Sequence, residues 1–211
     1  SGVTLAPVTF GGTQLPNRVA GIDGNEPLIK WRVSRIDSES GGRTDISYLP
    51  AECTASSLPT PETNTKRCFP SYWTPEDSVD PVRTWFHVYP VSQIVESDLT
   101  GGSPNKVTRF DYLGGTAWRY DDNELTKPKH RTWSQWRGYR TVKVRTGGED
   151  VTNSLTTSTY LRGMDGDHLP SGTRSVSVTD TQGTTVVEAD RTDGFLLETI
   201  SYNGVGGPEI G

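Results

Sequence analysis

The sequence predicts an all-β fold in which antiparallel hairpins stack into a curved sheet or partial β-shell, with two long irregular loops. The first observation is a period-two alternation of apolar and polar residues, as in residues 29–34 and 138–146. The second is the clustering of 23 Gly and 14 Pro between such stretches, which is typical of turns. No long stretch carries apolar residues at helical spacing, so helix is expected to be a minor part of the fold.

Four hairpins and one last strand follow from these patterns. The paired stretches are 29–34 with 45–49, 85–97 with 106–113, 138–146 with 154–161, and 174–179 with 184–189. Glycine pairs stand at two of the turns, Gly41-Gly42 and Gly147-Gly148, and glycine readily takes the positive φ angles of hairpin turns. Gly194 opens the last strand, which ends at Tyr202. Residues 50–81 and 114–136 fall outside the hairpins and are expected to form the irregular loops.

Length and composition indicate a β-rich segment of a larger protein. The 211 residues suit a single unit, with a subdivision into residues 1–113 and 114–211 as the alternative. The chain begins at Ser1 rather than Met and is expected to be a fragment. A net charge of −5 argues against a nucleic-acid partner, because no basic field is available to follow the phosphates. No apolar run reaches the roughly 18 residues that a membrane span requires.

The two cysteines, Cys53 and Cys68, both lie in the Pro- and Thr-rich loop of residues 50–81. A disulfide between them would stabilise the fold by about 3 kcal/mol, because it restricts the unfolded chain. Two cysteines are too few for a zinc site built from cysteine alone, and no histidine stands at metal-ligand spacing from them. We therefore expect the disulfide, and with it a secreted or cell-surface location.

The residues that usually carry catalysis form no recognisable motif. His87, His130 and His168 are far apart in the sequence, and none belongs to a His-x-x-x-His pair. No Gly-x-Ser-x-Gly nucleophile elbow occurs. The chain is therefore expected not to be an enzyme, and neither a catalytic residue nor a cofactor is predicted.

Asp165 and Asp167 flank Gly166 and are a weak candidate for a calcium site, since carboxylates around a glycine can wrap a Ca²⁺ ion. The later ligands of an EF-hand loop are missing from the sequence that follows. An Asp-Gly pair is itself a strong turn signal, so a turn without metal is the favoured interpretation.

Basic and aromatic residues interleave between Lys127 and Arg145, a pattern that fits either a stripe for polyanions or sugars or the solvated face of strands. Strand faces routinely carry Lys and Arg, which favours the second interpretation. A carbohydrate-binding module is nevertheless the alternative function. Its candidate residues are four aromatic side chains, which would have to be exposed, and one acid that would hydrogen-bond the sugar. The aromatic residues are Trp118, Tyr120, Trp133 and Trp136, and the acid is Asp122. Such rings at alternating strand positions more often belong to the core.

Two Asp-x-x-Gly motifs resemble the aromatic-Asp-x-x-Gly turn of tyrosine-aspartate (YD) repeats. In the first, Phe110 precedes Asp111 and Gly114, and in the second Asp180 precedes Gly183 without an aromatic residue. The stretches TWSQWRGY (residues 132–139) and YLRGMDGD (160–167) resemble segments of large secreted Rhs proteins of actinobacteria, as does the cysteine-bearing segment 51–73. Together these stretches extend the resemblance over most of the chain.

The resemblance implies a structural role. Rhs and related toxin-complex proteins build a hollow β-shell from many hairpins, and the shell encloses a toxic C-terminal domain. The chain would then be a non-catalytic segment of such a shell, with the rest of the shell and the enclosed toxin domain as its partners. An intact Tyr-Asp-x-x-Gly-Arg repeat is absent, as are the self-cleaving core and the variable toxin tip, so neither activity is carried over to any residue.

Overall fold

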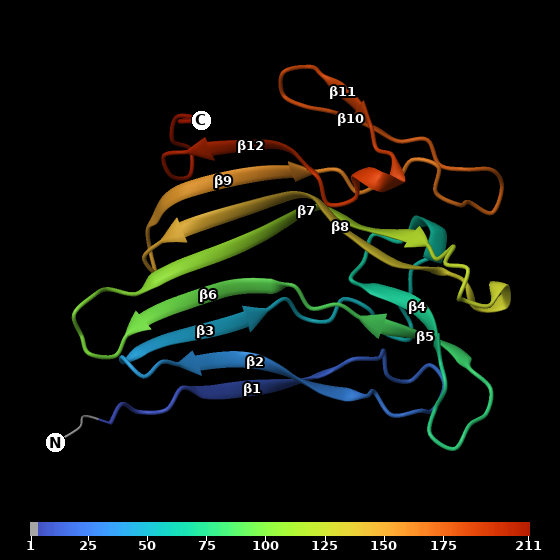
Figure 1. The fold of residues 1–211 in the computed structure, drawn as a ribbon, viewed down its shortest axis with the longest axis horizontal. Helices are drawn as coiled ribbons and strands as arrows, with labels where there is room; N and C mark the ends of the chain where they lie inside the picture. The colour runs from blue at the N-terminus through green and yellow to red at the C-terminus, as the bar shows by residue number, and fades with distance from the viewer. Residues whose placement is uncertain (1–3) are drawn as a thin grey trace.

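The computed structural model describes residues 4–211 and confirms the all-β class. Eight strands form one antiparallel sheet in the order β1-β2-β3-β6-β7-β8-β9-β12 (Figure 1). Because most neighbours in the sheet are also consecutive strands of the chain, the sheet is built largely from hairpins. The strands are β1 (Thr9–Pro16), β2 (Ile29–Asp37), β3 (Gly42–Tyr48), β6 (Val91–Asp98), β7 (Lys106–Tyr120), β8 (Trp133–Gly147), β9 (Thr152–Tyr160) and β12 (Leu196–Tyr202).

Two smaller hairpins lie toward one end of the main sheet (Figure 1). One pairs β4 (Cys68–Trp73) with β5 (Val82–His87), and the other pairs β10 (Ser177–Thr179) with β11 (Thr185–Val187). Helix in the described residues is confined to three short 3₁₀ turns, η1 (Pro61–Thr63), η2 (Pro128–His130) and η3 (Asp190–Thr192). Between residues 4 and 211, no helix has the length and apolar character needed to cross a membrane.

Three of the predicted hairpins and the last strand are confirmed. β2 pairs with β3 around the turn at Gly41, although through residues 35–37 and 43–45, and residues 29–33 pair with β1 rather than with 45–49 as predicted. β8 pairs with β9 around the turn that follows Gly147. The hairpin of β10 and β11 also forms, although its strands are short and make a separate sheet. β12 lies antiparallel to β9, as the outermost strand of the main sheet.

The prediction of one strand over residues 85–97 is wrong. β5 ends at His87 and belongs to the sheet with β4, whereas β6 begins at Val91 and pairs with β3 and β7. Pro90 stands between them and has no N–H to donate to a neighbouring strand, so a continuous ladder is interrupted there. The predicted pairing of the second half, β6 with β7, is present.

Strand β1 has no counterpart in the sequence prediction, because Gly11 and Gly12 interrupt its alternation. The structure explains the second glycine: the Trp31 indole lies over it, and a Cβ on Gly12 would come within 2.8 Å of the ring atom Cε3. The pairing of β1 with β2 shifts register between the two glycines, which marks a bulge. Gly12 therefore serves close packing on Trp31, and a Cβ on Gly11 would come within 3.1 Å of the Arg35 Cβ.

The predicted turn at Phe110–Gly114 and the predicted irregular loop 114–136 are both wrong in part. β7 continues through Gly114 to Tyr120, and β8 begins at Trp133, so the true loop is short. Gly114 and Gly115 have φ angles of 83° and 69°, and the register with β8 shifts beside them. A bulge formed by these two glycines lets the strand continue where a turn would have ended it. The alternative boundary at 113/114 falls inside this strand.

The predicted turn at Asp180 and Gly183 is confirmed. The Asp180 carbonyl accepts a hydrogen bond of 3.2 Å from the Gly183 N–H, and the Asp180 carboxylate accepts one of 2.7 Å from the Thr184 N–H. Gly183 has a φ angle of 87°, which glycine adopts without steric cost. Of the two Asp-x-x-Gly motifs compared with YD repeats above, the second thus makes a turn and the first makes a strand with a bulge.

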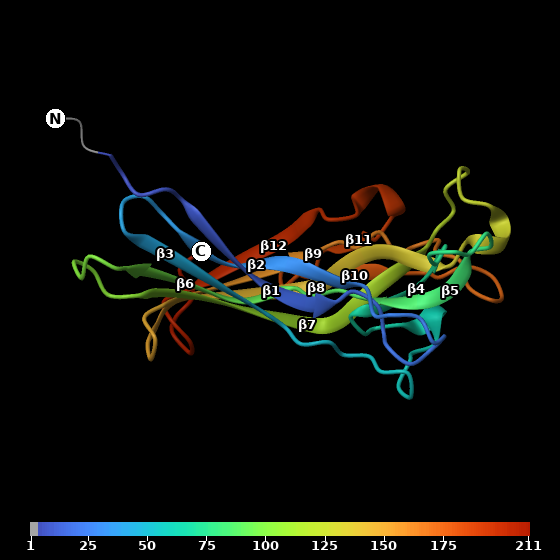
Figure 2. The same ribbon diagram turned by 90° about the horizontal axis from the view of Figure 1, so that it is seen from below.

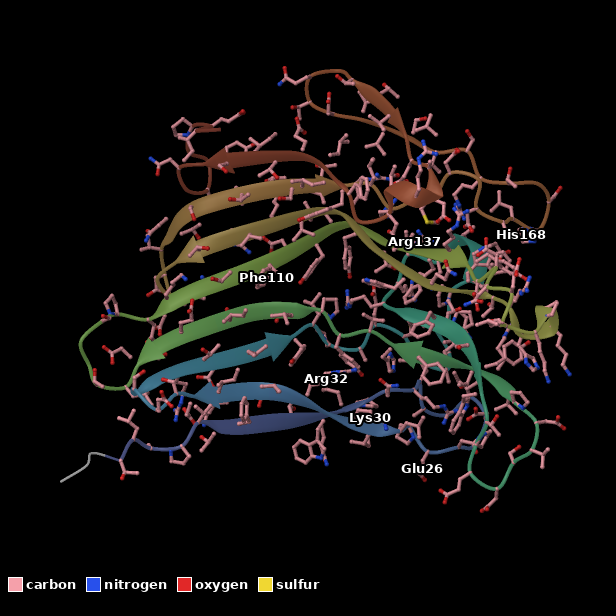
Figure 3. The ribbon with its side chains drawn as sticks, in the orientation of Figure 1. Glu26, Lys30, Arg32, Phe110, Arg137 and His168 are labelled. Carbon is pink, nitrogen blue, oxygen red and sulfur yellow. A yellow bond between two sulfur atoms is a disulfide. The ribbon has the colours of Figure 1, made fainter. Side chains whose placement is uncertain are left out.

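The pairing register separates the two faces of the main sheet, since paired residues share a face and successive residues alternate. One face, here called the ionic face, carries the cross-strand ion pairs Arg35–Asp45 (2.9 Å), Arg43–Asp37 (2.6 Å) and Arg145–Asp111 (2.8 Å). The other face, here called the apolar face, includes Phe110 on β7 (Figure 3). Its further members are Ile36, Ile46, Ile94, Tyr112, Val142 and Val144.

The main sheet is a single twisted layer, as the view from below shows (Figure 2). Apart from β4 against β8 and η1 against β7, the substantial contacts between elements join strands that are neighbours in a sheet. The apolar face is therefore only half-buried within residues 4–211. At the β1–β2 edge, Phe10 and Trp31 are 69% and 68% exposed.

The best-packed core lies beside the main sheet, around the disulfide. Cys53 and Cys68 are bonded with Cα atoms 6.2 Å apart, which confirms the predicted disulfide. Both are buried with Val19 and Trp85. Arg18 is also fully buried nearby, where its guanidinium donates to the Thr84 hydroxyl at 3.0 Å. The disulfide therefore holds the segment before β4, residues 50–67, against the β4–β5 hairpin. The prediction of an irregular loop over residues 50–81 is wrong in part, because this range includes β4.

Candidate functional site

Buried charges hold the YLRGMDGD stretch between β9 and β10. Glu188 is 0% exposed and accepts hydrogen bonds from both Nη atoms of Arg140, at 2.6 and 2.9 Å, and from the backbone N–H of Arg162. Burial lowers the pKa of the Arg162 guanidinium, and the nearby positive charge of Arg140 acts in the same direction. The charges of Glu188 and Arg140 are committed to each other, so this pair is a structural clamp.

Two arginines from β7 and β8 hold the turn η3. Arg137, labelled in Figure 3, reaches Asp190 at 2.8 Å and Asp193 at 3.3 Å. Arg119 reaches Asp190 at 3.3 Å and donates to the Gly163 carbonyl at 2.7 Å. Burial raises the pKa of Asp193, while the charge of Arg137 opposes that shift.

The basic stretch from Lys127 to Arg145 is therefore largely built into the fold. Arg137, Arg140 and Arg145 are paired with acids on other segments. Lys127 and Lys129 stand exposed on the loop around η2 and have no acidic partner among the described residues. The cations thus do not form one continuous stripe.

The weak calcium candidates, Asp165 and Asp167, hold backbone amides. The Asp165 carboxylate accepts a hydrogen bond of 2.9 Å from the Val176 N–H. The Asp167 Oδ1 accepts one of 2.9 Å from the Tyr120 N–H, and Asp167 is 1% exposed. In residues 4–211, no three side chains of His, Cys, Asp or Glu gather as they would around a metal ion. The geometry is that of a turn tied to two strands.

The three histidines contact different aromatic partners. His87 is buried with its ring 5.7 Å from Tyr89, and burial lowers its pKa. The other two rings each lie beside a tyrosine: His130 is 4.7 Å from Tyr72, and His168 is 4.6 Å from Tyr120. These contacts orient the rings by packing.

The five carbohydrate candidates do not form one surface. Trp118 is 2% exposed, stacks on Phe69 at 4.6 Å between ring centroids, and donates its indole N–H to the Lys66 carbonyl at 2.9 Å. It is a core residue, and its assignment to an exposed platform is wrong. Trp136 is 38% exposed and packs edge-on against Trp118, so its ring lies with that core.

Tyr120, Asp122 and Trp133 do come together, with His168 as a partner that sequence patterns do not indicate. The Tyr120 ring lies 5.0 Å from Trp133 and 4.6 Å from His168, and the Trp133 indole N–H donates to the His168 carbonyl at 3.0 Å. Beside these rings is a cavity of about 370 Å³, here called the Tyr120 pocket. Its lining residues are Arg119, Tyr120, Asp122, Arg131, Gly166, Asp167 and His168.

The segments that form the Tyr120 pocket are fixed from both sides. Asp121 accepts hydrogen bonds from the Asn123 N–H at 3.1 Å and the Thr126 hydroxyl at 3.0 Å, which closes the loop after β7. Arg131 donates its Nε–H to the Thr126 carbonyl at 2.9 Å. This contact leaves both Nη groups of Arg131 for another acceptor.

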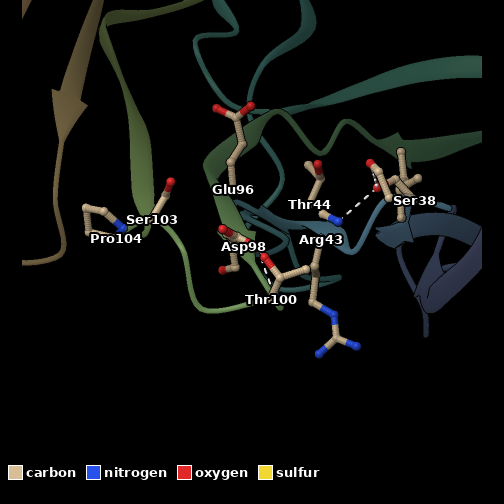
Figure 4. Close-up of a pocket in the computed structure, with 12 residues that line it drawn as sticks. Ser38, Arg43, Thr44, Glu96, Asp98, Thr100, Ser103 and Pro104 are labelled. Carbon is tan, nitrogen blue, oxygen red and sulfur yellow. Dashed lines mark hydrogen bonds between the residues drawn. The ribbon is translucent and has the colours of Figure 1, made fainter.

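Two other cavities are less suited to a specific ligand. One, of about 540 Å³, lies between the tips of the β2–β3 and β6–β7 hairpins (Figure 4). Its acids are engaged, since Glu96 pairs with Lys106 at 2.9 Å and Asp98 caps the turn through the Thr100 N–H. The other, of about 370 Å³, is apolar and lies beside Tyr139, on which the rings of Tyr112 and Trp136 both pack.

Comparison with protein-family models, with curated proteins and with solved structures found no match for this chain. The fold and the geometry of the Tyr120 pocket are therefore the observations from which function is argued.

Arg131, Asp167 and His168 are pocket residues that sequence reasoning does not group with Tyr120. The hydrogen bond from the Tyr120 N–H to Asp167 joins positions 47 residues apart, and no local pattern reports such a contact. The run of small and acidic residues around Gly166 indicates a turn, but not which strand the turn meets.

Proposed function

We propose that the chain is a non-catalytic structural segment of an Rhs/YD-repeat β-shell that encloses or presents a toxin domain of a secreted protein. The observation that carries the proposal is the single-layer antiparallel sheet, one face of which is apolar and lacks a second layer. An isolated globular domain buries such a face against another element. A shell wall instead uses it as an inner or packing surface.

The edges of the sheet support the same proposal. β1 and β12 are the outer strands, and β1 has no strand partner beyond it among residues 4–211. Beside β12, the Ile210 N–H donates to the Ser201 carbonyl at 2.9 Å, and Tyr202 bridges to Glu209. Residues 209–211 thus lie along part of the outer edge of β12. Open edges can accept further strands, as a wall built from successive hairpins requires.

The disulfide supports the secreted part of the proposal. Structural disulfides persist in oxidising compartments, and Cys53–Cys68 is buried in the best-packed core of the chain. The committed ion pairs around Glu188 and Asp190 support the structural part, because their charges hold segments together.

Hydrogen–deuterium exchange tests the proposal on this chain and on the longer parent protein. Amides of β1 that point away from β2 should exchange in this chain and become protected in the parent. Equal exchange of β1 in the two proteins would contradict a shell segment.

Dye binding gives a second readout with a matched control. The chain should bind a hydrophobic dye through the apolar face, and Phe110→Thr should reduce that binding. Lys143→Gln, on the ionic face of the neighbouring strand, should leave it unchanged. Equal effects of the two variants would argue against an exposed apolar wall.

A further inference from the structure

We infer that the Tyr120 pocket binds a neutral pyranose sugar, a function separate from the structural role proposed above. The pocket combines aromatic side chains with acids and a guanidinium in a volume of about 370 Å³, within the range of small-molecule sites. Its ring side chains, Tyr120 and His168, lie at its wall with Trp133 behind Tyr120. Apolar C–H faces of a sugar ring pack on such rings.

Asp167 fixes the wall of the pocket. It is the most buried side chain of the lining, and its Oδ1 accepts a hydrogen bond of 2.9 Å from the Tyr120 N–H. Its Oδ2 forms an ion pair of 3.5 Å with the Arg174 Nε. Both carboxylate oxygens are thus used within the protein, so the polar groups that meet a ligand are those at the rim.

Asp122 and Arg131 supply the remaining polar groups at the rim. The Asp122 side chain is exposed and makes no hydrogen bond or ion pair with residues 4–211. Arg131 uses only its Nε–H, so its Nη groups can donate. An acceptor and a donor of this kind can bind two neighbouring hydroxyl groups of a sugar, because each hydroxyl can both donate and accept a hydrogen bond.

The charge balance of the lining favours a neutral ligand. Arg119 is paired with Asp190 and Asp167 with Arg174, which leaves Asp122 and Arg131 as one charge of each sign in the lining. Asp122 repels an anion, while Arg131 repels a cation. The described residues also lack the three clustered ligands that a metal ion requires. Hydroxyl groups satisfy both signs of charge without a net charge of their own.

The test is a titration of the full chain with methyl glucoside, methyl galactoside, methyl mannoside and N-acetylglucosamine, followed by isothermal calorimetry and saturation-transfer NMR. At least one neutral sugar should bind saturably. Asp122→Asn and Arg131→Gln should each weaken its affinity about tenfold, as loss of a charge-assisted hydrogen bond does. Glu124→Gln, an exposed acid of the same loop outside the pocket, should not change it.

The variants lie at the rim, so thermal melts should show them folded like the parent chain. Absence of binding by every sugar, or equal binding by the Asp122 and Glu124 variants, would overturn the inference. Binding of glucuronate without any neutral sugar would overturn the assignment to neutral ligands. None of these results bears on the exchange experiment that tests the shell role.

Discussion

Glu188 carries the sharpest prediction about stability, because its carboxylate is fully buried and fully used. Replacement by glutamine preserves the volume but removes the charge and turns one acceptor oxygen into a donor that faces Arg140. Two charge-assisted hydrogen bonds, at 2.6 and 2.9 Å, are then lost or weakened. Each such bond contributes about 1.5–3 kcal/mol, and Arg140 is left without its counter-charge.

The expected cost of Glu188→Gln is about 3 kcal/mol, at the low end of the range for breaking a buried pair. The low end applies because the Arg140 side chain is 19% exposed and can recover some hydration. The measurement is urea unfolding of the oxidised chain, read as the change in the free energy of unfolding. A double variant, Glu188→Gln with Arg140→Gln, should lose less than the sum of the two single variants.

The matched control is an exposed pair with the same chemistry. Arg35 and Asp45 lie 2.9 Å apart on the ionic face, with side chains 47% and 38% exposed. Asp45→Asn should cost at most about 1 kcal/mol, because water screens such a pair. If Glu188→Gln proves no more destabilising than Asp45→Asn, the reasoning that burial gives the Glu188 cluster its strength is wrong.

Three further predictions concern the core and its pH dependence. Cys68→Ala should lower the free energy of unfolding by about 3 kcal/mol or more, since it opens a loop of 15 residues; chemical unfolding that matches the oxidised wild type would contradict this. Trp118→Ala should cost about 3–5 kcal/mol because the ring is buried, and an unchanged melting temperature would refute that placement. Burial holds the pKa of His87 below its ordinary 6.5, so the neutral ring contributes stability that is complete above pH 6.5 and is lost as the pH falls through the lowered folded pKa. Thermal melts between about pH 8 and pH 5 should show this loss in the wild type and a flatter profile in His87→Gln, and equal slopes in the two proteins would contradict it.

Local patterns predicted the elements whose partners are close in the sequence. The alternation in β8 and β9, with glycines between them, was sufficient because a hairpin needs only its own turn and register. The same reasoning failed at residues 85–97. There β5 pairs with β4, the strand that precedes it in the chain, and Pro90 separates β5 from β6. It also failed at Gly114, because a bulge and a turn use the same backbone freedom of glycine.

The candidate site shows the same division. The sequence brought Tyr120, Asp122 and Trp133 into one group because they lie on either side of one loop. It could not separate them from Trp118, since alternating positions on one strand carry the same residue types whether they face the core or a cavity. Only the packing of Phe69 on one ring and of His168 on the other distinguishes them.

The all-β class, most of the hairpins and the disulfide follow from local sequence patterns, because period-two alternation, glycine turns and two isolated cysteines act over short distances. The single-layer sheet with one apolar face, and the hydrogen bond from the Tyr120 N–H to Asp167 at the pocket, are visible only in the folded chain. Those features depend on strand order, register shifts and bulges. Each of these features depends on the free energy of packing between segments that are far apart in the chain. No short stretch of sequence contains both partners of such a contact.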